Sequence, residues 1–270
     1  IALGGTIAST PGRAGAGVVP GLSAADLVAA VPEAASLAEI GARNLSNLPS
    51  TEIGLPLLMD LAATIRAHEA EGVSGVVVTQ GTDTIEETAF FFDLLHASAK
   101  PVVVTGAMRS AGEPGYDGPV NLVDAVRCAA APALRGQGCL VVLAGAIHPA
   151  DDVVKTHTSA ITTFQSPNLG PIGHLDGDRV IVARRRAGRR RVAATVAAEP
   201  VILTTAVVAS DGRLVEAARA LRPAGFVVEA TGAGNTNPDL LEACRAAIEA
   251  GIPVVLTSRA PSGRAGTGYA

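Results

Sequence analysis

The feature that most constrains the fold is an apolar, β-branched run that ends abruptly in hydroxyl and carboxylate side chains. The sequence predicts a buried strand over 76–79, then a tight turn, then a helix. In a parallel sheet this places Thr82 and Asp83 at the carboxyl edge of a strand and at the positive end of a helix, where open sheets usually bind ligands. Thr84 and Glu87 match a capping box, which gives Thr84 a structural role. The two residues before it are therefore candidate functional residues.

Two other short apolar strands end in the same way. Residues 1–3 lead into two glycines and Thr6, and residues 101–105 lead into a glycine and Ala107. Strands that alternate with helices predict an α/β fold with a doubly wound, mostly parallel sheet. Because the carboxyl ends of parallel strands meet at one edge, we expect Thr6, Thr82 and Ala107 to lie near one another.

The sequence also predicts two domains. The large α/β domain is expected over 1–185, a linker over 186–200, and a smaller α/β domain over 201–270, where the alternation of strands and helices begins again. A hairpin is expected around Asp176 and Gly177. The basic run at 184–191 lacks interleaved aromatic residues and belongs to a net-acidic chain, so we interpret it as solvated linker and not as a phosphate site.

Helix signals are clear at several positions. Ser23 is a predicted N-cap for a helix that extends to Ala30, and a second helix is expected over 55–70. In the small domain, Asn237 followed by Pro238 matches an N-cap and first helical residue.

Composition excludes several classes of protein. The 270 residues are 48% hydrophobic and 17% charged, as in an ordinary globular protein. The net charge of −4 favours neither nucleic acid nor an anionic membrane as a partner. No apolar run is long enough to cross a bilayer. Cys128, Cys139 and Cys244 fit neither a disulfide framework nor a zinc site, so we expect no metal and a reducing, cytoplasmic location. Because the chain begins at Ile1 without a methionine, a periplasmic or secreted location is the alternative.

Three segments have both a structural and a functional interpretation. Lys155 is one of two lysines in a chain with nineteen arginines, and an amine can lose its proton where a guanidinium cannot. A capping contact would explain this lysine nearly as well. Ser50 alone favours the role of a helix cap. The glycine-rich residues 9–21 are expected to form a flexible loop, interpreted as a lid over the sheet edge, with a plain linker as the alternative.

One possible cofactor motif is rejected. The segment 232–237 has two of the glycines of a dinucleotide-binding loop but lacks the third, and no second βα unit with a ribose-binding acid follows. We therefore expect no cofactor.

Five motifs occur in a characteristic order: Gly4–Ala8, Gly81–Thr84 with Glu86–Ala89, Lys100–Arg109, Asp117–Pro119 with Asn121–Leu122, and Lys155–Thr156. Together they resemble the bacterial L-asparaginase and glutaminase-asparaginase family over essentially the whole chain. Each motif alone is weak, but the combination is highly specific.

The resemblance implies hydrolysis of L-asparagine to L-aspartate and ammonia through a threonine acyl-enzyme, without a cofactor. Thr6 matches the nucleophile of the family. Thr82, Asp83 and Lys155 match a second group, in which a lysine held by a carboxylate acts through a hydroxyl. The order in which the two threonines act follows from the family and not from spacing.

The resemblance also implies how the small-molecule substrate is held. Ser50 and Asp83 match positions that bind the α-carboxylate and the α-amine, Thr51 stands where a glutamine is common, and the carbonyl side of Ala107 lines the amide end. Asn237 matches a residue that a neighbouring subunit contributes. A homotetramer built as a dimer of dimers is therefore expected.

Three departures from the family keep alternatives open. Residues 9–21 contain no tyrosine, Gln80 replaces a common histidine, and the family continues beyond the end of this chain, so the small domain is expected to be incomplete at its C-terminus. Together with Thr51, these differences allow a glutaminase or an amidase for another amide. A non-catalytic amino-acid binding protein is the third alternative, although binding alone would not need a deprotonatable lysine behind a hydroxyl.

Overall fold

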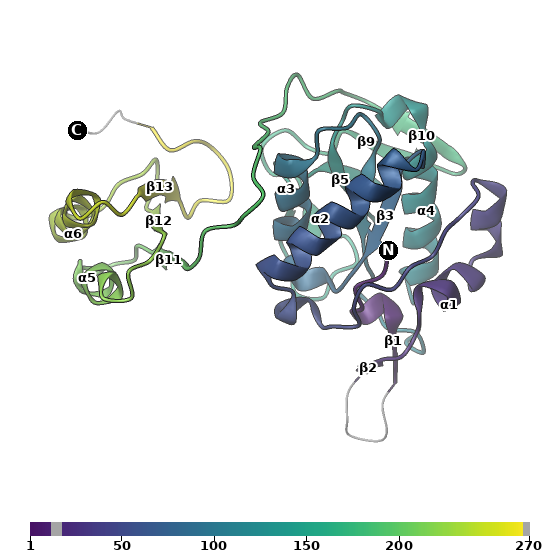
Figure 1. The fold of residues 1–270 in the computed structure, drawn as a ribbon, viewed down its shortest axis with the longest axis horizontal. Helices are drawn as coiled ribbons and strands as arrows, with labels where there is room; N and C mark the ends of the chain where they lie inside the picture. Colours follow the sequence, from purple (N-terminus) through teal and green to yellow (C-terminus); the bar gives the residue numbers. More distant parts are fainter. Residues whose placement is uncertain (12–17, 267–270) are drawn as a thin grey trace. The chain divides into compact units, whose positions relative to one another are not determined.

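The computed structural model describes residues 1–11 and 18–266. The chain divides into two compact units, Ile1–Thr195 and Val196–Ala270, and each is described by itself (Figure 1). The division falls within the predicted linker over 186–200, whose limits stay a prediction.

The first unit is built on a mixed six-stranded sheet with the order β10-β9-β6-β5-β4-β3. Strands β3, β4 and β5 are parallel, as predicted, whereas β6, β9 and β10 join the sheet in antiparallel pairs. The predicted hairpin is the pair β9 and β10. The strand bounds are β3 Val76–Thr79, β4 Val102–Thr105, β5 Cys139–Leu143, β6 Ala146–Pro149, β9 Gly173–Asp176 and β10 Arg179–Val182.

In the described structure the predicted first strand lies beside β3 but makes only isolated parallel bridges, from Ala2 to Thr79 and to Asn44. The Leu3 N–H donates to Thr79 O (2.9 Å), and the Thr79 N–H donates to Ile1 O (3.0 Å). In β4, Thr105 lies level with Thr79. The carboxyl ends of three neighbouring segments therefore meet at one edge of the sheet.

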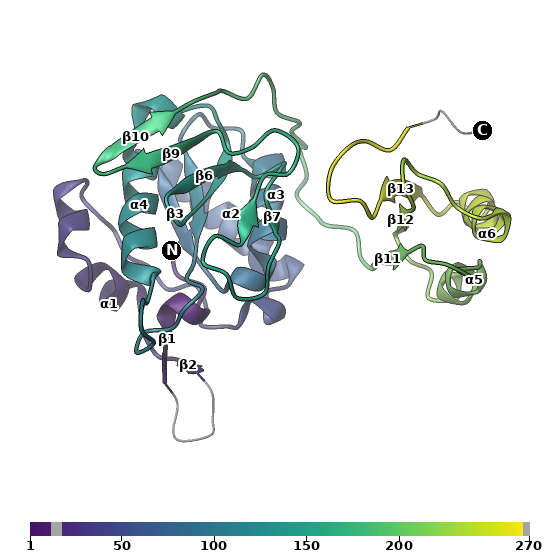
Figure 2. The same ribbon diagram turned by 180° about the vertical axis from the view of Figure 1, so that it is seen from behind.

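Helices cover both faces of this sheet (Figures 1 and 2). Successive side chains of a strand point to opposite faces, so Val102 and Val104 pack with α2 and α3, whereas Val103 packs with α4. The predicted helix over 55–70 is confirmed as α2. The helix bounds are α1 Ala24–Ala29, α2 Leu55–Ala70, α3 Ile85–Leu95 and α4 Gly118–Ala130.

One predicted helix cap is confirmed and another is wrong. Ser23 accepts from the Asp26 N–H, and Asp26 accepts from the Ser23 N–H, which forms a capping box at α1. Thr84 occupies the N-cap position of α3, but its side chain caps nothing. Its hydroxyl instead donates to Ser50 O (3.1 Å), because a neighbouring segment offers it a carbonyl.

Two short hairpins complete the first unit. Strands β1 (Ser9–Pro11) and β2 (Val18–Pro20) pair within the segment predicted to be a flexible loop, so that prediction is wrong for these residues, and 12–17 lie outside the described residues. Strands β7 (Val154–Lys155) and β8 (Phe164–Gln165) form a second, separate pair.

The second unit is an α/β unit, as predicted, and consists of a parallel three-stranded sheet covered on one face by two helices. Phe226 and Val228 pack under the helices, whereas Leu203 and Val255 are 61% and 56% exposed. The bounds are β11 Val201–Thr205, α5 Arg213–Arg219, β12 Gly225–Ala230, α6 Pro238–Glu249 and β13 Val254–Ser258, and the strand order is β11-β12-β13.

Some functions lack support in the described part of the chain. None of its helices has the length and apolar character needed to span a bilayer. Nor does it hold a group of three or more histidine, cysteine, aspartate or glutamate side chains suited to a metal ion.

The basic run is only in part the solvated segment that its composition predicts: Arg185, Arg190 and Arg191 are exposed, but the other arginines of the run are not. The side chains of Arg186 and Arg189 are buried and meet at Asp93 on α3. Arg186 makes two hydrogen bonds to the Asp93 carboxylate, at 2.8 and 2.9 Å, and Arg189 Nε adds a third at 3.1 Å. The Cys139 N–H also donates to Asp93. One buried carboxylate therefore holds this segment against the first unit.

Replacing Asp93 with asparagine tests how much the ion pairs of Asp93 with Arg186 and Arg189 stabilise the fold. Asp93→Asn keeps the shape but removes the counter-charge of the buried Arg189 and one of the two carboxylates that pair with Arg186, so we expect the free energy of unfolding to fall by about 3–5 kcal/mol. Urea unfolding followed by circular dichroism measures it. Asp60→Asn, at an exposed position of α2, is the control and should change stability by less than about 0.5 kcal/mol. Equal effects of the two substitutions would contradict a stabilising role of the Asp93 ion pairs.

Candidate active site

Two glycine turns touch at the sheet edge. Gly5 has a φ of 83°, and a Cβ on it would lie 2.0 Å from Gly81 N, so only glycine allows this approach of the two backbones. The residues that follow these glycines begin the short helices η1 (Thr6–Ala8) and η4 (Thr82–Thr84). The structure therefore brings together the turns that carry the two candidate threonines, which lie 76 residues apart in the sequence.

Lys155 reaches this edge from β7. Its Nζ donates to Thr82 Oγ1 at 2.9 Å and to Asp83 Oδ1 at 2.6 Å. The lysine side chain is 15% exposed and the aspartate side chain is 65% exposed. A nearly buried amine is thus in contact with a buried hydroxyl and paired with a carboxylate open to solvent. This is the arrangement that a hydroxyl and its base require.

Ser50 lies directly behind Gly81. Its side chain is buried, and a Cβ on Gly81 would come within 2.9 Å of Ser50 Oγ. Ser50 is the first residue of η3 (Ser50–Glu52) and does not cap it, so the prediction of a helix cap is wrong. Thr51, the next residue, is exposed. The bond from Thr84 to Ser50 O holds η3 against η4.

The third strand end is held by a buried polar network. Ala107 is fully buried, and the Met108 and Arg109 N–H groups donate to the Asp117 carboxylate. Asn121 Nδ2 donates to Gly106 O (3.0 Å), and its Oδ1 accepts from the Ala144 N–H. Two side chains of the Asp117–Asn121 motif therefore fix the backbone beside Ala107.

The fully buried Gln80 lies below the Thr82 turn. Its Nε2 is 3.4 Å from both Gly81 O and Thr84 Oγ1, while its Oε1 has no hydrogen-bond partner in the described structure. The Gln80 amide group is therefore directed toward the turn that carries Thr82 and Asp83.

Two residues beside the site escaped the sequence analysis. Glu86 accepts a hydrogen bond from the backbone N–H of Lys155 at 2.5 Å, and burial raises the pKa of its carboxyl. Tyr116 donates from its hydroxyl to Ile7 O at 2.7 Å, next to Thr6, and burial raises its pKa. The available signals for Glu86 were its place one turn after Thr82 and its position at the start of the motif Glu86–Ala89.

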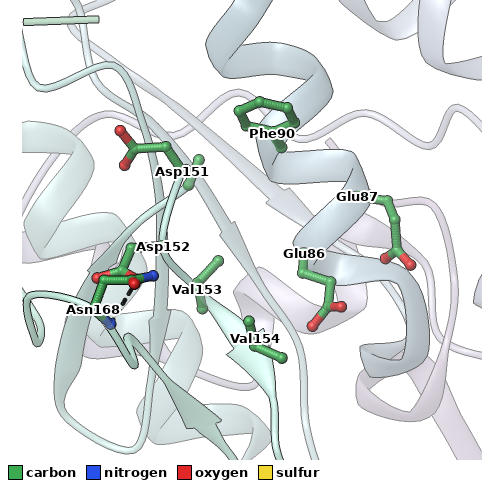
Figure 3. A pocket seen from close by; sticks show the side chains of 9 residues that line it. Glu86, Glu87, Phe90, Asp151, Asp152, Val153, Val154 and Asn168 are labelled. Carbon is green, nitrogen blue, oxygen red and sulfur yellow. Dashed lines mark hydrogen bonds between the residues drawn. The ribbon is translucent and has the colours of Figure 1, made fainter. Parts of the chain in front are cut away.

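A cavity of roughly 300 Å³ lies beside these residues, not over them. It is bounded by α3 and by the segment that leads into Lys155 (Figure 3). Neither threonine lines it. The lining side chains are Glu86, Glu87, Phe90, Ala150, Asp151, Asp152, Val153, Val154 and Asn168.

Asn237 belongs to the second unit. Its Oδ1 accepts from the Leu240 N–H at 2.8 Å and its Nδ2 donates to Ser210 O, so it is the N-cap of α6, as predicted. Pro238 is the first residue of that helix.

Comparisons with known proteins point to one family. Residues 1–188 match "Asparaginase, N-terminal", and residues 200–270 match "Glutaminase/Asparaginase C-terminal domain". The chain is 34% identical to an L-asparaginase of Bacillus licheniformis, over 100% of this chain and 84% of that protein. It is 36% identical to a probable periplasmic L-asparaginase of Haemophilus influenzae, over 90% and 71%. A crystal structure of a probable cytoplasmic L-asparaginase from Campylobacter jejuni superposes with a TM-score of 0.91 at 31% identity, over 99% and 85%.

The contact of the two turns can be tested at Gly5. Gly5→Ala combines an unfavourable φ with a backbone clash. Gly136→Ala, at a φ of 79° in open space, has the unfavourable φ but no clash. We expect about 1–2 kcal/mol of lost stability for Gly136→Ala and about 2–5 kcal/mol for Gly5→Ala. Chemical denaturation measures both. Equal losses would show that the turns do not press against each other.

Proposed function

The chain belongs to the asparaginase family, and from that membership we propose that it hydrolyses L-asparagine to L-aspartate and ammonia. The observation that carries the proposal is the contact of Lys155 Nζ with Thr82 Oγ1 and Asp83 Oδ1, beside the turn that bears Thr6. The relatives named L-asparaginase span most of this chain. Hydrolysis of an amide in this way requires no cofactor.

In the proposed reaction, Thr6 Oγ attacks the side-chain amide carbon of the substrate. An unprotonated Lys155 amine accepts the hydroxyl proton of Thr82, and the Thr82 oxygen takes the proton of Thr6. The C–N bond of the tetrahedral intermediate then breaks, and the leaving nitrogen takes the proton that Lys155 had accepted, so that it departs as ammonia. Water attacks the remaining ester, which releases aspartate and restores the threonine.

The surrounding groups suit the other parts of an amino-acid substrate. Ser50 and the exposed Asp83 are proposed to bind the α-carboxylate and the α-amine, with Thr51 next to them. Backbone N–H groups of the glycine turns are proposed to stabilise the oxyanion, and Ala107 to line the amide end. A carboxylate that is already paired with one amine in solvent, as Asp83 is, can accept a second cationic partner.

The assay is ammonia release from L-asparagine and L-glutamine at neutral pH, without added metal or nucleotide. We expect release from asparagine, and a fall in kcat of about 10²–10⁴-fold for each of Thr6→Ala, Thr82→Ala and Lys155→Met. Thr162→Ala, at an exposed threonine outside the site, is the control and should keep the parent rate.

Other outcomes would redirect the proposal. Release from glutamine alone would make the protein a glutaminase. Binding of asparagine without turnover, by folded protein, would indicate an amino-acid binding role. A Thr6→Ala protein with the parent rate would contradict the assignment of the nucleophile.

We also propose that the protein acts as a homotetramer, a dimer of dimers in which Asn237 reaches the site of a neighbouring subunit. The exposed apolar side chains of Leu203 and Val255 on the open sheet face of the second unit favour burial against another chain. The expected location is the cytoplasm, where the buried, unpaired Cys128, Cys139 and Cys244 would stay reduced.

Mixing two variants tests the shared site. Asn237→Ser keeps a capping hydroxyl for α6 but removes the amide, and it should lower activity. Equal amounts of Thr6→Ala and Asn237→Ser, unfolded and reassembled together, should recover about a quarter of the parent activity, because half of the dimers are mixed and each has one intact site. Light scattering gives the assembly size. A fully active monomer would contradict the proposal.

A further inference from the structure

We propose that Glu86 is a positioning residue for Lys155, which it holds through the backbone while Thr82 and Asp83 hold the amine. This inference rests on the proposed function, because it concerns the lysine assigned there as the base. It adds a residue that lies outside the candidate set and touches neither threonine hydroxyl in the described structure.

The partners of the Lys155 amine and of the Lys155 backbone N–H lie in one short segment. Thr82 and Asp83 belong to η4, and Glu86 belongs to the first turn of α3, which follows η4 directly. The Nζ contacts are 2.9 and 2.6 Å, and the backbone contact to Glu86 Oε2 is 2.5 Å. The turn that bears the hydroxyl thus also fixes the position of its base.

The strand that carries Lys155 has apolar anchors in the core, Val153 and Phe164, and the bond to Glu86 adds a polar one. Within residues 1–11 and 18–266, β7 has two residues, pairs only with the two residues of β8, and is separate from the six-stranded sheet. The next residue, Thr156, donates to Thr163 O within the same hairpin. The bond to Glu86 is therefore a direct link from this hairpin to the helix that follows Thr82.

Glu86 differs from Asp151 and Asp152, which also line the cavity, because those two carboxylates have partners other than Lys155. Asp151 pairs with Arg186 at 2.7 Å, and Asp152 accepts from the Asn168 and Leu169 N–H groups. Figure 3 shows Glu86 extending toward Val154, the neighbour of Lys155, whereas Glu87 turns away.

The titration of Glu86 has opposing causes. Burial raises the pKa of Glu86, and the nearby charge of Glu87 raises it further, whereas the bond and the charge of Lys155 lower it. The net direction is upward. A raised pKa means that Glu86 is protonated at a higher pH than an ordinary glutamate, and protonation weakens the acceptor for the Lys155 N–H.

The alternative is that Glu86 only complements the dipole of α3, as an acidic residue in a first turn commonly does. Glu87 stands in the same turn and would serve that purpose equally. A substitution at Glu87 therefore separates the two interpretations.

The chain allows a direct measurement, because Lys100 and Lys155 are its only lysines. Labelling with ¹⁵N-lysine gives two backbone amide signals, which a Lys155→Arg variant assigns. We expect the Lys155 signal to lie downfield and to shift as Glu86 titrates above the range of an ordinary glutamate. Glu86→Gln should abolish this titration, whereas Glu87→Gln should keep it. The Lys100 amide, which donates to Ser98 Oγ, is the internal reference.

Kinetics supply the second readout. Glu86→Ala should lower kcat about 10²-fold with little change in KM, since misplacing a catalytic group costs rate more than binding. Glu86→Gln keeps an acceptor for the N–H and should recover part of this loss. Glu87→Gln should keep the parent kcat.

The outcomes separate the two proposals. A Lys155 signal that does not respond to Glu86→Gln, or equal kinetic effects of Glu86→Gln and Glu87→Gln, would overturn the role of Glu86. If the parent protein releases no ammonia from either amide, the proposed function fails, and the amide titration alone decides whether Glu86 holds Lys155.

Discussion

The site depends on the backbone contact between Gly5 and Gly81. Each glycine ends a segment of the parallel part of the sheet and directly precedes a threonine, so the separation of the two turns sets the separation of the two helices that they begin. A side chain on either glycine would meet protein atoms at 2.9 Å or less. The missing side chain of Gly5 therefore lets the turn before Thr6 approach the turn before Thr82, and that of Gly81 makes room for Ser50. The hydrogen bonds between Ile1–Leu3 and Thr79 of β3 hold together the two segments that lead into these glycines.

Local signals in the sequence predicted most of the fold. Val76–Thr79 and Val102–Thr105 are short, β-branched and bounded by turn residues, and strands of this kind need no knowledge of their partners to be recognised. The same holds for Ser23, whose capping partner is three residues away. The residues predicted to meet at the sheet edge do so because parallel strands share one carboxyl edge, which is a consequence of topology.

The failures at Thr84, at the arginine run and at Glu86 involve partners distant in sequence. Thr84 has the pattern of a cap, but Ser50 O is available to its hydroxyl. The arginine run has the composition of a solvated segment, but Asp93 is a charge buried on α3 that no periodicity marks as a partner. Glu86 looks like any acid at the start of a helix, and its contact with Lys155 spans 69 residues. Side-chain patterns report the local backbone and not the long-range contact that competes with it.

The two carboxylates around Lys155 differ in what they can contribute. Asp83 is the closer to the amine, but it is 65% exposed, and exposed ion pairs are screened by water and contribute only about 0.2–1 kcal/mol. A hydrogen bond to a charged group contributes about 1.5–3 kcal/mol, and Glu86 accepts its bond from the Lys155 backbone N–H, which cannot rotate away as a side chain can. The exposed pair is compatible with the proposal that Asp83 also accepts a substrate amine. On that proposal, Glu86 and Thr82 are the contacts that keep the lysine in position when Asp83 changes its partner.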